Sequence, residues 1–388
     1  MRARGALAVM GAALVLLATG CPTPPTGGGD PVPVGSLSRI TSYTWPTDTS
    51  FISGDGQWVF YVTEDGNDNE GALHLWNRAT SQDVAITDAS KRTRPLGLST
   101  DGRYSTFSRD EGSGQWSVNS YDRTTGITTT VPSATINGDS VVRTSASGAV
   151  LYAVNDGTNS VVHRWTPSTG IDETVLTGSN FLLPLAMSPD GNSAVYILFG
   201  SDLATSGDGL YAGPVGGPLS LVVNGQLDEQ HPFATPYFAS NVAISNSGDV
   251  IYTRFTEGSE NYIIASGVIR LWSAADATTV DLVAPAGRVA ATTGISGDGR
   301  YISYLNLPAP LNTGDFDGSE GKFPAGGRIE RLDRQSATSI LMTYGRVGIG
   351  ELAVSALSDD GNSAVIASND PSGDDNGELM DLFLWANI

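Results

Sequence analysis

The sequence contains few of the residues on which most enzyme and metal sites depend. Its 388 residues include one cysteine, Cys21, and three histidines, His74, His163 and His231, which fall in different parts of the chain. A single cysteine excludes an internal disulfide, and no two histidines have the spacing of a metal-binding pair. The nucleophile elbow, the phosphate-binding loop and the dinucleotide fingerprint are also missing. The motifs of the chain therefore give little support to catalysis.

Positive charge and helical patterning are scarce as well. The formal net charge is −20, because 41 acidic residues outnumber 21 lysines and arginines. Such a chain lacks the basic surface that nucleic acids require in a partner, and it favours cations or a basic protein surface. No amphipathic helix is evident after the first twenty residues, and the 47 glycines are typical of a turn-rich all-β protein.

Apolar residues form a long run only at the N-terminus, from Ala6 to Ala18, after Arg2 and Arg4. We interpret residues 1–20 as a secretory signal, since the run is too short for a membrane-spanning helix. It ends in Leu17-Ala18-Thr19-Gly20-Cys21, where small residues precede the cysteine.

This ending resembles the bacterial lipoprotein box, which implies cleavage and lipidation at Cys21. Ordinary cleavage that removes the thiol or leaves it free is the alternative. Residues 21–35 are rich in proline and glycine. They predict a tether that its prolines keep extended and its three consecutive glycines make flexible. The protein is thus expected to be exported and lipid-anchored in the cell envelope, at the bacterial outer membrane.

One phrase recurs seven times after the tether. A hydrophobic residue and a serine precede a small or acidic pair that ends in glycine, and an alternating apolar run follows. The seven serines, 43 to 62 residues apart, are Ser53, Ser99, Ser145, Ser188, Ser245, Ser296 and Ser358. Asp-Gly favours a tight turn between antiparallel strands, and self-similarity at this period is typical of propellers.

Each copy divides into four strands, except the last. The seventh copy stops at Ile388 after its third strand, and Leu37–Thr41 has the residue pattern of a fourth strand. Pairing this N-terminal strand into the last blade would bury two edges that are otherwise exposed. We therefore predict an all-β fold over residues 36–388: a seven-bladed β-propeller of four-stranded antiparallel blades, closed by the N-terminal strand.

The Ser-x-Asp-Gly phrase and the strands around it resemble the TolB-type, WD40-like propeller repeat over nearly all of residues 36–388. Met187-Ser188-Pro189-Asp190-Gly191 matches the repeat consensus most closely. The lipoprotein box, the lack of a separate α/β domain and the seven copies depart from the protein that gives the repeat its name. The resemblance therefore implies the fold and not a role in the Tol system. Propellers of this type also precede hydrolase domains in prolyl-oligopeptidase-like enzymes, for which no residues remain here.

The long connections are expected on one face of the propeller, opposite the Asp-Gly turns. They join the second strand to the third, or one blade to the next, and loops on a rigid scaffold commonly hold binding sites. The longest connection between blades provides the candidate binding residues His231, Phe233, Tyr237 and Phe238. We expect an envelope protein or a small ligand to bind on this face.

Three loops of this face contain acidic clusters with glycine. Such oxygen ligands suit calcium, which takes six to eight of them. The candidate ligands are Asp315, Asp317, Glu320, Asp374 and Asp375. None of the clusters has the EF-hand spacing, and solvated turns whose side chains cap their own backbone are the alternative. No cofactor is required by the sequence, and calcium is the one it suggests.

Aromatic and histidine side chains on the third strands are interpreted as packing. The tryptophans that recur at one repeat position are Trp76, Trp116, Trp165, Trp272 and Trp385. His74 and His163 lie beside tryptophans on these strands, where packing is expected rather than metal ligation.

The combination of lipoprotein box, tether and repeat array favours a lipid-anchored envelope protein whose propeller is a binding or scaffold module. Two alternatives stay open. One is a propeller hydrolase or lyase with acids and His231 in the central funnel, and the other is a calcium-stabilised adhesive or structural protein. Contact with the membrane is expected through the lipid anchor only.

Overall fold

The computed structural model describes residues 32–41, 50–64, 71–87, 91–112, 115–136, 142–155, 159–178, 181–199, 209–224, 242–257, 263–309, 311–312, 327–344, 352–369 and 380–387. Contacts separate Met1–Val32 from Pro33–Ile388, and every described strand belongs to the second part. Within the described ranges, no helix is long and apolar enough to cross a membrane.

The strands form antiparallel groups of four, numbered here as sheets 1 to 7. Sheet 1 contains β2 (Ser50–Ile52), β3 (Trp58–Glu64), β4 (Gly71–Asn77) and β5 (Gln82–Ala85); sheet 2 contains β6 (Thr93–Leu98), β7 (Tyr104–Gly112), β8 (Gln115–Asp122) and β9 (Ile127–Ile136); sheet 3 contains β10 (Val142–Thr144), β11 (Val150–Asn155), β12 (Ser160–Thr166) and β13 (Ile171–Gly178); sheet 4 contains β14 (Phe181–Met187), β15 (Ser193–Phe199), β16 (Gly209–Pro214) and β17 (Ser220–Asn224).

The remaining sheets follow the same plan. Sheet 5 contains β18 (Val242–Ile244), β19 (Val250–Glu257), β20 (Ile263–Trp272) and β21 (Thr279–Val283); sheet 6 contains β22 (Arg288–Ile295), β23 (Tyr301–Pro308), β25 (Arg328–Asp333) and β26 (Thr338–Tyr344), with the short β24 (Leu311–Asn312) beside it; sheet 7 contains β27 (Leu352–Leu357), β28 (Ser363–Asn369), β29 (Met380–Ala386) and β1 (Ser36–Arg39).

Hydrogen bonding joins sheets 5 and 6 into one nine-stranded sheet, so the described strands form six sheets where the sequence predicts seven separate ones. The junction is small: Gly267 of β20 pairs in parallel with Val289 of β22, and β24 pairs with β20. Gly267 permits this approach, because a Cβ there would lie 2.7 Å from Cγ1 of Val289. Each half otherwise keeps four antiparallel strands.

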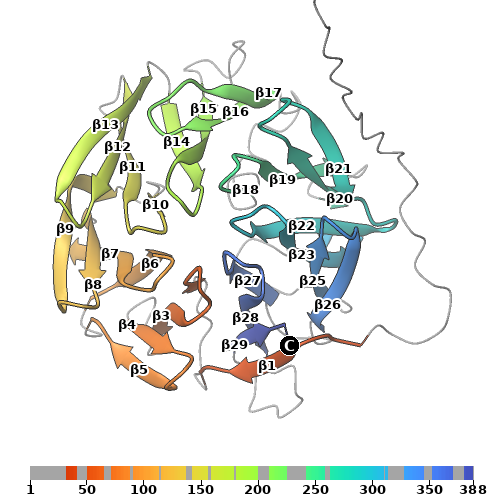
Figure 1. Cartoon of the computed structure of the whole chain (residues 1–388), viewed down its shortest axis with the longest axis horizontal. Coiled ribbons are helices and arrows are strands. Elements are labelled where there is room, and N and C mark those ends of the chain that lie inside the picture. The colour runs from red at the N-terminus through yellow and green to blue at the C-terminus, as the bar shows by residue number, and fades with distance from the viewer. Residues whose placement is uncertain are drawn as a thin grey trace, which may run out of the picture. The chain divides into compact units, whose positions relative to one another are not determined.

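Figure 1 shows the sheets arranged around a common centre, with the first strand of each sheet innermost. β1 pairs antiparallel with β29, with Leu37 opposite Trp385 and Arg39 opposite Phe383. The N-terminal strand therefore takes the outer position in sheet 7, and the predicted pairing of the two ends of the chain is observed. We call the end of the sheets that carries the seven Ser-x-Asp-Gly phrases the turn edge. The opposite end, where second strands end and third strands begin, is called the loop edge.

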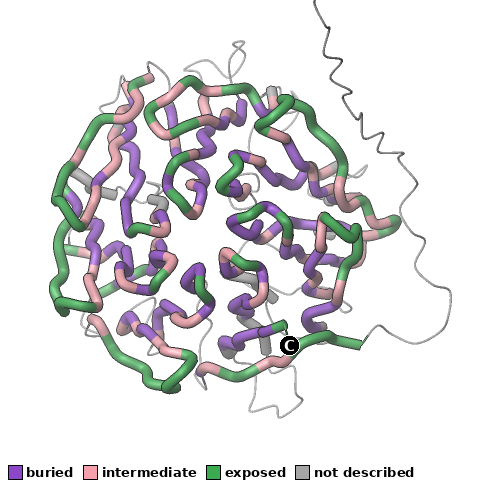
Figure 2. Tube along the Cα trace, in the orientation of Figure 1, coloured by how far each residue is buried: buried purple, intermediate pink, exposed green. Residues whose placement is uncertain are grey.

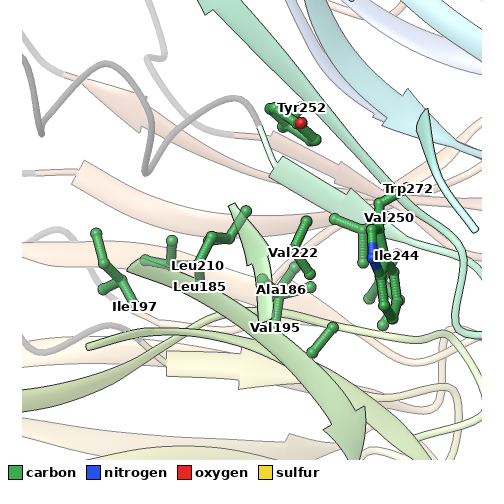
Figure 3. Close-up of a cluster of buried hydrophobic side chains, with 11 residues drawn as sticks. Leu185, Ala186, Val195, Ile197, Leu210, Val222, Ile244, Val250, Tyr252 and Trp272 are labelled. Carbon is green, nitrogen blue, oxygen red and sulfur yellow. The ribbon is translucent and has the colours of Figure 1, made fainter. Parts of the chain in front are cut away.

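The core lies between neighbouring sheets. Figure 2 shows buried residues along the inner and middle strands and exposed residues along the outer ones. Figure 3 shows one such layer, in which Leu185 and Val195 of sheet 4 pack with Ile244 and Trp272 of sheet 5. Both faces of a sheet are covered in this way, and apolar side chains that leave water on both faces stabilise each contact between sheets.

A corresponding layer joins sheet 7 to sheet 1. It contains Val59 and Tyr61 from β3 and Val365 and Leu384 from β28 and β29. The first and last sheets are therefore in apolar contact, as consecutive sheets are.

Candidate functional site

All candidate site residues from the sequence lie outside the described residues. They are Cys21, His231, Phe233, Tyr237, Phe238, Asp315, Asp317, Glu320, Asp374 and Asp375. Lipidation, ligand binding and calcium binding at these residues therefore stay predictions. Within the described ranges, no three histidine, cysteine, aspartate or glutamate side chains lie close enough together to hold a metal ion.

Each Ser-x-Asp-Gly phrase folds as a turn that hydrogen bonds of its own side chains stabilise. In the five copies with an aspartate, the serine hydroxyl donates to that carboxylate at 2.5 to 2.8 Å. The same hydroxyl accepts the N–H of the residue five positions later at 2.8 to 2.9 Å. Ser147 and Ser247 replace the aspartate in the other two copies. The glycine has a φ between 65° and 84° in all seven copies, a conformation that glycine adopts without strain.

Hydrogen bonds also join the seven turns to one another at the turn edge. Backbone N–H groups donate to backbone oxygens in the pairs Asp55 to Thr100, Thr100 to Ala146, Ala146 to Pro189, Asn246 to Gly297, Gly297 to Asp359, and Asp359 to Gly54. Pro189 has no N–H to continue the series. At that place the N–H of Asp190 donates to Oδ1 of Asn246 at 2.9 Å. The series ends where it began, so the hydrogen bonds form a circle through all seven copies.

Asp359 is the one acidic residue that directly follows a phrase serine. The hydroxyl of Thr100 in sheet 2 donates to Oδ2 of Asp359 in sheet 7 at 2.8 Å, across Gly54 of sheet 1. Burial raises the pKa of the Asp359 carboxyl, and the charges of Asp360 and Asp55 add to the rise against the opposing hydrogen bond from Thr100. The turn edge thus contains a carboxyl group that holds its proton to a higher pH than an ordinary aspartate does.

The free energy of unfolding of the wild type is expected to fall as Asp359 ionises with rising pH. The substitution Asp359→Asn removes this ionisation and should therefore remove the fall. A carboxyl with a raised pKa in the folded state binds more protons than in the unfolded state, so stability falls as pH rises from the ordinary pKa through the raised one. Asp360→Asn is the matched control with the opposite sign. Its carboxyl has a lowered pKa, because the donors Ser358 and Asn362 outweigh burial, so the charge stabilises the fold above the ordinary pKa.

Urea unfolding of both variants from pH 2 to pH 8 measures the difference, because the Asp360 contribution changes below the ordinary pKa of 3.8 and the Asp359 contribution above it. Relative to wild type, Asp359→Asn should gain stability as the pH rises, whereas Asp360→Asn should lose it. A constant difference between Asp359→Asn and wild type over this range would contradict the raised pKa.

The loop edge of sheet 2 carries a basic cluster. Lys91 and Arg92 precede β6, Arg94 lies in it, and Arg109 lies near the end of β7. Glu111 accepts from Nζ of Lys91 at 2.7 Å and from Nη2 of Arg109 at 2.6 Å. Hydrogen bonds led by those from Lys91 and Ser117 lower the pKa of Glu111 to about 2. The run of basic residues from residue 91 to residue 94 is readable in the sequence.

Trp116 departs from the repeat position that the sequence assigns to it. Trp76, Trp165, Trp272 and Trp385 pair with Val59, Val150, Val250 and Ala364, at equivalent positions after the turn. The equivalent place in sheet 2 is held by Tyr121, and Trp116 pairs with Asp110 nearer the loop edge. The prediction of a shared position is wrong for Trp116, because the register of β7 and β8 puts Tyr121 at that position. The guanidinium carbon of Arg94 lies 5.1 Å from the centre of the Trp116 ring.

Sheet 6 holds a network of ionisable side chains that begins at the loop edge. Arg288, the first residue of β22, donates through Nη2 to the carbonyl of Asn306 at 2.6 Å. The Asn306 amide donates to Oε1 of Glu330 at 2.8 Å, and the Tyr304 hydroxyl donates to Oε2 of Glu330. Burial, and then the charge of Glu330, raise the pKa of Tyr304 well above its usual range. The phenol therefore stays protonated and does not act as a base near neutral pH.

Two histidines have structural partners, as expected from their places on third strands. Nδ1 of His74 lies 2.9 Å from Oδ2 of Asp83, which also accepts the Tyr61 hydroxyl at 2.9 Å, and the two rings stack. Sheet 3 repeats the arrangement with Tyr152, His163 and Asp172. The recurrence in two sheets indicates a packing motif on the sheet surface rather than a catalytic group.

Comparison with known proteins identifies a fold and no closer relationship. No family model and no curated protein matches the chain. Among solved structures, an oligogalacturonate lyase from Vibrio parahaemolyticus matches with a TM-score of 0.56 and 11% identity, covering 91% of this chain and 93% of that one. An oligogalacturonate lyase in complex with manganese matches with a TM-score of 0.55 and 13% identity over the same shares.

A third similar structure is the β-propeller domain of the Trilobed protease from Pyrococcus furiosus, which is described as having an open velcro topology. Its TM-score is 0.55 and its identity 10%, covering 89% of this chain and 93% of that domain. Identities this low show the fold alone. The chain forms a β-propeller, and its four-stranded sheets are the blades.

Proposed function

We propose that this protein is exported and lipid-anchored in the bacterial envelope, where a closed seven-bladed propeller of TolB-type repeats acts as a binding module. The observation that carries the proposal is the difference between the two edges. At the turn edge, backbone N–H groups of the seven turns donate to oxygens of neighbouring turns, and these hydrogen bonds form a circle. At the loop edge, the guanidinium of Arg94 is exposed and lies over the ring of Trp116. The loop edge is therefore the surface that we assign to a partner.

Three observations support closure into seven blades. Sheet 7 is completed by β1, an apolar layer joins sheets 7 and 1, and the N–H of Asp359 donates to the carbonyl of Gly54 at 2.9 Å. The contact between sheets 5 and 6 leaves each with four antiparallel strands, so they count as two blades. β1 covers the edge of β29 that would otherwise be exposed at the seam, which favours a stable scaffold.

The described N-terminal segment attaches at the outer side of the last sheets, away from the loop edge. The indole N–H of Trp385 donates to the carbonyl of Val34 at 2.8 Å, and the N–H of Val34 donates to the carbonyl of Leu341. A tether over residues 21–35 would reach about 50 Å when extended, at ~3.3 Å per residue. An anchor on Cys21 would therefore leave the loop edge accessible.

Site-specific crosslinking in whole cells tests this proposal. A photoreactive amino acid is placed at Gln115, exposed at the loop edge, or at Ser147, exposed at the turn edge. We expect a covalent adduct with an envelope component from Gln115 and none from Ser147, and we expect Cys21→Ser to move the protein from the membrane to the soluble fraction. Adducts from Ser147 alone would refute the binding surface, and a membrane-bound Cys21→Ser protein would refute the anchor.

A propeller enzyme is the second candidate, favoured by the convergence of Arg288, Tyr304 and Glu330 in sheet 6. Two of the similar structures are oligogalacturonate lyases, one with manganese. Cleavage of oligogalacturonate by this protein, dependent on manganese and abolished by Glu330→Gln, would favour catalysis over binding. The calcium-stabilised alternative rests on the acidic loops and stays a prediction, which a fall in melting temperature on chelation would support.

A further inference from the structure

The outer strand of sheet 6 is buried at a position where the outer strands of the other sheets are exposed. Leu341 of β26 lies opposite Glu330 and is 5% exposed. The residues at the equivalent position of the other six sheets are all exposed, and they are Ala85, Thr130, Thr174, Leu221, Asp281 and Arg39. A leucine alone does not explain the burial, since Leu221 is 48% exposed. A feature that the other sheets do not share therefore covers β26 at Leu341.

The N-terminal segment meets β26 at this residue. The N–H of Val34 donates to the carbonyl of Leu341 at 2.8 Å, and the carbonyl of Val34 accepts the indole N–H of Trp385 at 2.8 Å. Gly35 directs the chain from sheet 7 to sheet 6, because its φ is 98° and a Cβ there would lie 2.7 Å from Nε1 of Trp385. Both polar groups of the Val34 backbone thus face the molecule, as they do at every second residue of a paired strand.

Prolines alternate with valines before Gly35, in the order Pro31-Val32-Pro33-Val34. In an extended segment beside a strand, the backbone groups of every second residue face that strand. Val32 therefore has the same phase as Val34, whereas Pro31 and Pro33 have the opposite phase. Proline lacks an N–H and is tolerated in an edge strand where that position faces solvent. Both prolines thus stand where pairing with β26 needs no donor.

We propose that residues 31–34 bind along the outer edge of β26 as a fifth strand of sheet 6. Among the described strands, β26 is the last in the hydrogen-bonded order of this sheet, and such an edge pairs readily with an extended segment. The occupant is the tether of the same chain, because Val34 already donates to β26 and is continuous with β1. The prolines leave the new edge without donors for a further strand.

This inference goes beyond the proposed binding function and does not rest on it. It changes the length of tether that is free to move. Only residues 21–30 would then lie between Cys21 and the propeller, and they reach about 33 Å when extended, at ~3.3 Å per residue.

Amide hydrogen exchange, followed by NMR on the mature protein in detergent with isotope label at valine and alanine, tests the inference. We expect the N–H groups of Val32 and Val34 to exchange about tenfold or more slowly than in a free peptide of residues 27–36. Val34→Pro removes the donor to Leu341. It should return Val32 to the exchange rate of the free peptide, because the segment then loses the bond that aligns it with β26.

Pro33→Ala is the matched control. It adds an N–H of the opposite phase, which should exchange at the rate of the free peptide while Val32 and Val34 stay protected. Pro31→Ala should behave in the same way. A tether that only collapses onto the surface would protect all of these N–H groups alike. Circular dichroism and the melting temperature show whether each variant is folded.

Four results would overturn the inference. They are exchange of Val32 at the free-peptide rate in the wild type, protection of the new N–H at residue 33 equal to that of Val32, unchanged protection of Val32 in Val34→Pro, and protection of Val32 that rises with protein concentration. The last would assign the edge of β26 to the tether of a second copy. The exchange rates should be the same in Cys21→Ser, so failure of the lipid anchor and failure of this inference are distinguishable.

Discussion

Trp385→Ala is expected to lower the free energy of unfolding by about 4 kcal/mol, the usual range for truncating a buried tryptophan being about 3 to 5. The side chain is 1% exposed and packs with Ile329 and Ile366 in the layer between sheets 6 and 7. Its indole N–H also donates to the carbonyl of Val34, and its ring contacts the guanidinium of Arg331. One substitution therefore removes a core side chain and the contact that holds the N-terminal segment.

Trp165→Ala is the matched control for the position of Trp385 at the seam. Trp165 has the same repeat position and the same 1% exposure, but it lies between sheets 2 and 3. Both variants should lose a similar amount of stability in urea. Only Trp385→Ala should make residues 33–41 sensitive to protease under native conditions. Equal protection of this segment in both variants would show that β1 is held without Trp385.

Trp385→Phe separates packing from the hydrogen bond. Phenylalanine keeps most of the apolar contact and removes the donor to Val34, so a loss of about 1 kcal/mol is expected from the bond itself. A similar loss in Trp385→Phe and Trp385→Ala would mean that the bond, rather than the packing, holds the seam.

The repeat phrase explains why so much of the fold was predictable from the sequence. Each Asp-Gly is a local signal, and each leads into a strand whose hydrogen bonds lie within its own sheet. The N-terminal strand was predictable as well, because the last copy lacks a fourth strand and Leu37–Thr41 supplies the matching pattern. The bridge at Gly267 was not predictable, since it depends on how closely two neighbouring sheets approach.

The environment of Asp359 and the contact of Arg94 with Trp116 were harder to predict from the sequence than the fold, and for a different reason. The residue after each phrase serine varies in type, so Asp359 looks like one more turn residue until its neighbours in sheets 1 and 2 are known. The support of Arg94 by Trp116 depends on the register of β7 and β8, which places this tryptophan away from the repeat position that the sequence indicates. A repeat predicts what its copies share, whereas these sites are made where single copies differ.

Basic side chains at the two edges are held by carboxylates and by aromatic rings. At the turn edge, Arg103 donates two hydrogen bonds to the carboxylate of Asp122. Arg300 does the same to the carboxylate of Asp333. These donors hold the pKa of both carboxyls well below the usual range. At the loop edge, Arg94 has the face of Trp116 in place of a carboxylate. The turn edge uses aromatic support as well, since the guanidinium carbon of Arg123 lies 4.0 Å from the centre of the Trp58 ring, and the loop edge uses ion pairs as well, at Lys91 and Arg109.

Gly54→Ala is expected to destabilise the protein by about 2 to 3 kcal/mol, as overpacking of a filled site does. A Cβ at residue 54 would overlap Oδ2 of Asp359 and would lie 2.6 Å from Cγ2 of Thr100. Neither neighbour can retreat without breaking the hydrogen bond between Thr100 and Asp359. The absence of a side chain at residue 54 is thus what admits the carboxyl group to the turn edge.

Combining Gly54→Ala with Asp359→Ala should restore much of the lost stability, because the second substitution removes the group that the new methyl meets. A coupling energy of about 1 to 2 kcal/mol in a urea double-mutant cycle is expected for such neighbours. Gly297→Ala is the matched control at the same place in the sixth copy, where a Cβ would lie 3.3 Å from Cβ of Asp359 and 3.0 Å from Nδ2 of Asn246. Its smaller crowding predicts a smaller loss. Additive effects of Gly54→Ala and Asp359→Ala would mean that the carboxyl does not occupy the space above Gly54, and the bridge from sheet 7 to sheet 2 would then be absent in solution.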